Sequence, residues 1–272
     1  MNILYNILYK RRFWEIDFLR AIAIFMMITF HIVFDIDYFK NYNLVSPYNF
    51  WWYFARATAT LFLTLVGISL TLSYSRIIHL SKNRDFRKIY IKYIIRGMKI
   101  FSWGLLITFI TFIFLRKGTI LFGILHLIGV SIILAYPLLK FRILNLIIGV
   151  FFILLGLFIS NFYVEYPWLI WLGVKTTNFY TFDYFPVLPW FGVVLIGIFL
   201  GNIFYPNYKR SFKLPDLSKN LMVKHMCFLG RHSLRVYLIH QPVLIGVLYM
   251  VGMIDISTLF HIFSCIFNLF RI

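Results

Sequence analysis

The sequence has few acidic residues, almost no cysteine and little charge overall. Its 272 residues include 9 Asp and Glu, 2 Cys and only 13% charged residues. Cys227 and Cys265 lie far apart and outside any metal-ligand spacing, so neither a disulfide framework nor a thiol site is expected. With 61% hydrophobic residues and a mean hydropathy of +0.84, the composition excludes a soluble globular domain.

Long apolar runs dominate the chain instead. At about 20 residues per membrane-spanning helix, they fill about eight spans joined by short loops. The first run is preceded by a basic cluster and no small-residue cleavage site, so we expect it to be retained. The fold class predicted is all-α, a polytopic helical bundle forming one transmembrane domain over residues 1–272, multi-pass in the cell membrane. The predicted spans are 16–34, 54–72, 95–115, 121–139, 143–160, 190–204, 233–250 and 256–270.

The basic residues are concentrated in alternate loops. They precede the first predicted span and fill the connection between the second and third, which predicts that these segments and both termini are cytoplasmic. The formal charge of +18 does not indicate nucleic-acid binding, because the cations flank helices in short loops. Orientation and contact with anionic lipids account for most of it, and a basic cytoplasmic mouth would also attract a phosphorylated cosubstrate.

An unusual polar stripe runs along the first predicted span. Arg20 and His31 are eleven residues apart, about three helical turns, and so share a face at roughly 16 Å separation. Asp17 and Asp35 extend the same stripe by about one turn at either end. Ionisable side chains inside a membrane are costly unless they are paired or face a watered cavity, so the stripe predicts a functional interior face. The structural alternative is a terminal Asp17–Arg20 ion pair and a His31 that bonds a carbonyl.

Three further polar groups occur near helix ends. His126 enters the fourth predicted span from the outer side, and either a structural or a catalytic hydrogen bond would suit it. Asp183 precedes the sixth span, which Trp190 opens, and the carboxylate could simply cap a helix. Tyr237, His240 and Gln241 lie along one face of the seventh span, where they could line a site or hold helices together.

The ordered segments RRFWEIDFLRAIAIFMMITFHIVFD, FGILHLIGVS, FDYFPVLPWFG and GRHSLRVYLIHQPV resemble the heparan-alpha-glucosaminide N-acetyltransferase catalytic-domain family, within the transmembrane acyltransferase superfamily. In related sugar O-acyltransferases an arginine and a histidine are spaced on the first span as Arg20 and His31 are here. Two departures limit the transfer. Ala21 stands where such motifs often have glycine, and no counterpart of the large lumenal part of the lysosomal enzyme is found, so heparan is not implied as the acceptor.

The resemblance implies a membrane acyltransferase that takes an acyl group from cytoplasmic acetyl-CoA or another acyl-CoA, with no metal, and delivers it to an extracytoplasmic glycan or related acceptor. His31 is predicted as general base or acyl carrier and Arg20 as a ligand of the coenzyme. Asp183 would orient an imidazole or acceptor hydroxyl. The substrate-binding residues expected are Asp17, Asp35, His126, Trp190, Tyr237, His240 and Gln241. A transporter or flippase for a lipid-linked or sugar substrate, a noncatalytic scaffold, and a homo-oligomeric assembly stay open.

Overall fold

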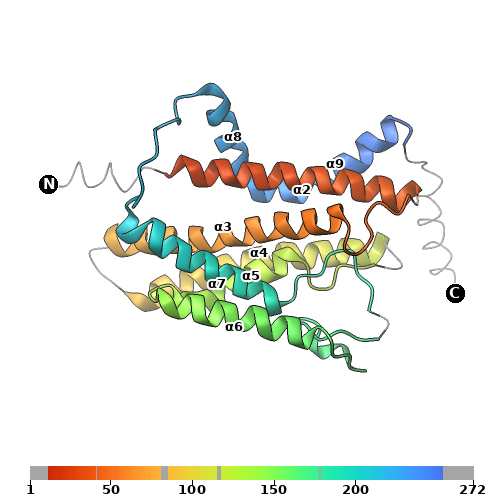
Figure 1. Cartoon of the computed structure of the whole chain (residues 1–272), viewed down its shortest axis with the longest axis horizontal. Coiled ribbons are helices and arrows are strands. Elements are labelled where there is room, and N and C mark those ends of the chain that lie inside the picture. Colours follow the sequence, from red (N-terminus) through yellow and green to blue (C-terminus); the bar gives the residue numbers. More distant parts are fainter. Residues whose placement is uncertain (1–11, 41, 81–84, 115–117, 178, 254–272) are drawn as a thin grey trace. The chain divides into compact units, whose positions relative to one another are not determined.

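Helices make up most of the computed structural model, which describes residues 12–40, 42–80, 85–114, 118–177 and 179–253. Three isolated bridges and no strand occur among them, so the all-α prediction is confirmed for this part of the chain. Single 3-10 turns lie at Tyr136–Leu138, Pro167–Leu169 and Pro206–Tyr208. The helices are α2 (Trp14–Lys40), α3 (Phe50–Leu80), α4 (Phe86–Phe114), α5 (Ile124–Ala135), α6 (Ile143–Ile159), α7 (Val187–Phe204), α8 (Leu221–Arg231) and α9 (Ser233–Met250), as Figure 1 shows.

Five of these helices are long and apolar enough to cross a membrane: α2, α3, α4, α7 and α9. They correspond to five of the predicted spans, whereas α5 and α6 are apolar but shorter. The predicted span 256–270 lies outside the described residues. The chain is thus a multi-pass membrane protein, and the total of eight spans and the cytoplasmic placement of both termini stay predictions.

The contacts divide the chain into two compact units, each described here by itself. The first unit contains Leu63–Lys213 and the second contains Arg12–Phe62 with the described part of Leu214–Ile272. In the first unit α4 packs on α5, and α7 packs on both α5 and α6 (Figure 1).

Glycine sets the helix spacing in the first unit. A Cβ on Gly67 of α3 would overlap the backbone of Val194 and Ile198 in α7, and a Cβ on Gly197 would overlap the carbonyl of Thr64. The two backbones therefore meet directly, which is how small residues drive helix association where lipid leaves no hydrophobic force between helices. Gly149 and Gly192 allow the same approach between α6 and α7.

In the second unit α2 packs against α8 and α9. Gly230, near the end of α8, sits so close to α2 that a Cβ there would overlap the carbonyl oxygen of Asp17. One turn earlier, the Cys227 thiol donates to the carbonyl of Trp14 at 3.3 Å. This contact fixes the C-terminal end of α8 against the first turn of α2.

Candidate functional site

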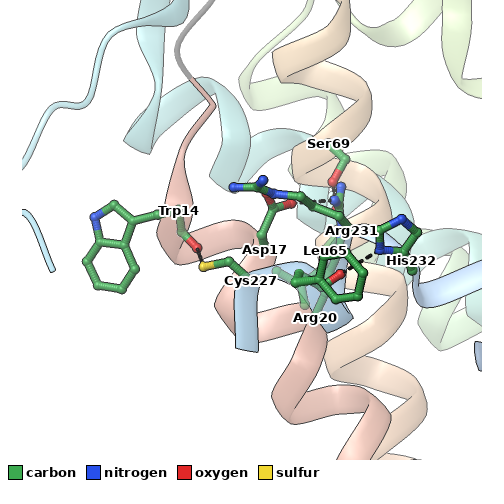
Figure 2. A network of polar contacts seen from close by, with 9 residues as sticks. Trp14, Asp17, Arg20, Leu65, Ser69, Cys227, Arg231 and His232 are labelled. Carbon is green, nitrogen blue, oxygen red and sulfur yellow. Dashed lines mark hydrogen bonds and ion pairs between the residues drawn. The ribbon is translucent and has the colours of Figure 1, made fainter. Parts of the chain in front are cut away.

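A buried carboxylate joins two arginines where α2 meets α8. Asp17 has a side chain that is only 4% exposed, and it receives Arg20 Nη1 on one oxygen at 3.0 Å and Arg231 Nε on the other at 3.1 Å. Figure 2 shows this cluster with Cys227 at the carbonyl of Trp14. A buried carboxylate is stable only if it is paired and hydrogen-bonded, and the two guanidinium groups supply both conditions.

Sequence reasoning paired Asp17 with Arg20 in its structural alternative but missed Arg231. The two positions are 214 residues apart, and no local pattern could connect them. A usable signal was present in the periodicity of α8, where Val223, Met226, Cys227 and Gly230 repeat at helical spacing and none of them is exposed.

Farther along α2, the His31 ring meets the ring of His240 from α9. Their centroids are 4.7 Å apart, and the rings are nearly perpendicular. His31 Nδ1 lies 2.9 Å from the carbonyl oxygen of Met27, and His240 Nδ1 lies 2.5 Å from that of Tyr237. A carbonyl only accepts, so in both neutral rings Nδ1 carries the proton and donates it, leaving the Nε2 lone pair for other chemistry.

A second polar pair lies beside the histidines, one turn farther along α2 and one residue farther along α9. Gln241 Nε2 donates to Asp35 Oδ1 at 2.6 Å, and Asp35 is 3% exposed. Three buried atoms around this point have no hydrogen-bond partner within the described part of the chain: Asp35 Oδ2, Gln241 Oε1 and His240 Nε2. Buried polar atoms in native proteins are nearly always satisfied, and each exception asks for a reason. All three are acceptors as assigned, so a donor-bearing group such as an amine or a hydroxyl would satisfy them.

Tyr237 lies beside His240 and helps to position its ring. Its carbonyl holds His240 Nδ1, and its ring lies 5.4 Å from the imidazole, centroid to centroid. The sequence-predicted residues His31, Asp35, Tyr237, His240 and Gln241 are thus brought together between α2 and α9, which we call the histidine-pair site. Arg20 and Asp17 lie on the same helix toward its other end.

The first unit holds the other predicted residues around the start of α5. Asp183 Oδ2 accepts the backbone amide of Ile124 at 3.1 Å, and His126 Nδ1 accepts that of Gly123 at 3.2 Å. The carboxylate therefore caps α5, whereas its sequence position suggested a role at the helix that follows it. Trp190 is on α7, where its ring contacts Phe185 at a centroid distance of 4.9 Å.

The loops on either side of the α5 cap are paired through their backbones. Phe122 forms a bridge with Tyr184, and Phe185 donates to the Phe122 carbonyl at 2.9 Å. The Tyr184 hydroxyl donates to the carbonyl of Ile170 at 2.7 Å, and burial raises the pKa of this phenol above its ordinary value, so it keeps the proton that it donates. Asp183 is thereby carried to α5 by an ordered aromatic loop.

Among the described residues, no group of three or more His, Cys, Asp or Glu side chains lies close enough to hold a metal ion.

The long apolar helices define a multi-pass membrane protein, and buried polar groups lie between them. Comparison with family models matches residues 12–242 to the heparan-alpha-glucosaminide N-acetyltransferase catalytic domain, and the chain belongs to this family. The family is one of membrane acetyltransferases, so transferase activity is the chemistry that membership implies. Comparison with curated proteins and with solved structures found no match.

Proposed function

We propose that this protein is an acyl-CoA-dependent acyltransferase of the cell membrane. It takes an acyl group, acetyl by preference, from the cytoplasmic coenzyme and transfers it to an amine or hydroxyl of an extracytoplasmic glycan or related acceptor. Family membership supports acetyl as the group transferred and coenzyme A as its carrier in the donor. The single observation that carries the proposal is the histidine-pair site, where two imidazoles, each with an Nε2 lone pair that can accept a proton, adjoin buried acceptor atoms that need a donor.

The reaction needs a group that removes a proton from the attacking atom. In our proposal His31 Nε2 takes this proton from the acceptor nitrogen or oxygen as that atom bonds to the thioester carbon. The C–S bond then breaks, and the thiolate receives the proton to leave as free coenzyme A. The Met27 carbonyl, by fixing the proton on Nδ1, keeps the His31 lone pair on the reacting nitrogen.

His240, Asp35 and Gln241 bind the acceptor in this scheme, and Tyr237 positions His240. Their unpartnered atoms would each accept a hydrogen bond from a substrate amine or hydroxyl. Arg20 and Asp17 hold the opposite end of the α2 stripe, where Arg20 is proposed to act toward the donor. Asp183, His126 and Trp190, which lie in the first unit, are proposed for the acceptor side.

The alternative route passes the acyl group through histidine. His31 Nε2 could attack the thioester itself and form an acyl-imidazole, which the acceptor would then break. Rapid quenching without acceptor distinguishes the routes: one equivalent of coenzyme A released in a burst, with a 42 Da adduct on the His31 peptide after acetyl-CoA, would establish the two-step path.

The test measures release of free coenzyme A from acetyl-CoA by the protein in lipid nanodiscs, with a panel of amino sugars and glycans as acceptors. His31→Gln should reduce acceptor-dependent release by roughly 10²–10⁴-fold, because glutamine is polar but cannot take the proton. His225→Gln is the matched control, since His225 makes the same Nδ1 contact to the carbonyl four residues earlier but is exposed on α8.

Equal activity in His31→Gln and wild type would remove His31 from the mechanism. No release from folded wild-type protein with any acceptor, together with no binding of acetyl-CoA, would favour the transporter or flippase reading, and uptake of labelled sugars into proteoliposomes would then be the assay.

A further inference from the structure

A basic pocket lies at the junction of α8 and α9, apart from the histidine pair. Its volume is about 510 Å³, and it is lined by Arg12, Arg231, His232, Ser233, Leu234 and Arg235. Three of the six are arginines and none is a carboxylate. All six belong to the second unit.

The Asp17 carboxylate, which binds the pocket-lining Arg231, is already engaged by two arginines. Asp17 accepts a hydrogen bond from Nε of Arg231, and the Arg231 side chain nevertheless stays 46% exposed. Arg12 and Arg235 are exposed as well. Three guanidinium groups around one hollow repel one another, and an anion within it would relieve that repulsion. Arginine is the side chain whose planar fork matches phosphate oxygens two at a time.

The start of α9 opens into the same pocket. His232 is the N-cap and provides no side-chain cap, since its Nδ1 instead donates to the carbonyl of Phe228. The first amides of a helix have no acceptor within the helix, and together with the helix dipole they favour an anion. Ser233 adds a hydroxyl at this point. The guanidinium groups and the hydroxyl thus present donors to one space, at the positive end of the α9 dipole.

From this arrangement we infer that the pocket binds the phosphate groups of the donor's nucleotide, the adenosine 3′-phosphate 5′-diphosphate part of acyl-CoA. The inference rests on the proposed function for the identity of the donor. The volume falls within the range of pockets that bind small organic ligands. Sequence reasoning assigned the coenzyme to Arg20, which binds Asp17 as Arg231 does but does not line the pocket, whereas Arg12, Arg231 and Arg235 do.

Anionic lipid headgroups carry the same phosphate chemistry, and basic residues at membrane edges commonly contact them. The experiment therefore uses nanodiscs of phosphatidylcholine alone and, in a second arm, nanodiscs containing phosphatidylglycerol. The probe is adenosine 3′,5′-bisphosphate, and its Kd is measured by calorimetry. Arg12→Gln and Arg235→Gln should each weaken binding about tenfold, the loss of one charge-assisted hydrogen-bonding partner. Lys224→Gln is the control, because Lys224 is an exposed cation on α8 outside the pocket.

A second measurement separates the pocket from the reaction. Acetyl-pantetheine carries the same thioester as acetyl-CoA but none of the nucleotide phosphates. The ratio of kcat/KM for acetyl-CoA to that for acetyl-pantetheine should fall about tenfold in Arg12→Gln and Arg235→Gln and stay at the wild-type value in Lys224→Gln. A variant that merely misfolds would lose both donors together and leave the ratio unchanged.

Each outcome has one meaning. An unchanged Kd and an unchanged donor ratio in both arginine variants would refute phosphate binding in the pocket while leaving the acyltransferase proposal standing. Probe binding that depends on the arginines, with no turnover of either donor by wild type, would refute the proposed function but keep a phosphate site. Binding of the probe only in the absence of phosphatidylglycerol, with no change of donor ratio in the variants, would assign the pocket to lipid headgroups and refute the inference.

Discussion

Replacing Gly230 by alanine should break the cluster that joins α2 to α8. The new Cβ would overlap the Asp17 carbonyl oxygen and lie 2.8 Å from its carbonyl carbon and 3.2 Å from the Ala21 amide nitrogen. These are backbone atoms of a helix, so no side chain can turn aside. To restore a separation of about 3.5 Å, α8 must move by more than about 1 Å.

This movement has a calculable cost. Arg231 is the next residue, and its 3.1 Å bond to Asp17 would lengthen beyond hydrogen-bonding range. Overpacking costs about 1–3 kcal/mol, and the loss of a hydrogen bond to a charged group about 1.5–3 kcal/mol. Since the two effects overlap, we expect a total of about 2–5 kcal/mol, which corresponds to a Tm lower by roughly 5–15 °C on the scaling of globular domains.

The assay is thermal unfolding in nanodiscs, followed by intrinsic fluorescence and by binding of adenosine 3′,5′-bisphosphate. Gly246→Ala is the matched control, because a Cβ there meets nothing within 4 Å and alanine favours the helix by up to about 1 kcal/mol. A Tm for Gly230→Ala equal to that of Gly246→Ala would show that α8 does not lie against α2 as described, and would remove the basis for the Arg231 contact.

Two other perturbations follow from the structure. Asp183→Asn should keep a side-chain oxygen for the Ile124 amide and hold its Tm near wild type, whereas Asp183→Ala should lose about 0.5–2 kcal/mol of cap energy; equal Tm values for the two would refute the cap. Burial and the nearby Asp17 carboxylate raise the pKa of the Cys227 thiol. In a Cys265→Ser variant, iodoacetamide should therefore fail to label Cys227 at pH 7.5, because only the thiolate reacts. Labelling as fast as that of an exposed cysteine would contradict the packing of α8.

Sequence reasoning located most helices, since long apolar runs are read directly from hydropathy. It missed α8, an 11-residue amphipathic helix too short for a span, and placed the start of the fourth helix at residue 121, whereas α5 begins at Ile124. The displaced start has a physical cause. Phe122 is paired with Tyr184, and the helix begins only after the loop that carries this pair.

The stripe on α2 was predictable because helical spacing alone sets it, and His240 and Gln241 could be placed on one face of α9 for the same reason. What could not be predicted was which faces meet. The pairing of His31 with His240 joins segments about 200 residues apart, and the Asp17–Arg231 ion pair joins segments 214 residues apart. Such contacts depend on how helices pack, and packing in turn depends on single positions such as Gly230.

The direct backbone contact between α3 and α7 limits how the first unit can move. Two helices that meet through side chains can slide, because rotamers exchange partners at little cost. Helices that meet through Gly67 and Gly197 have no rotamers at the contact, so any relative displacement separates them outright. We therefore expect α3 and α7 to move together as one rigid unit. In the proposed acyl transfer, movement of the acyl group would therefore rely on side-chain rotations and not on a rocking of α3 against α7.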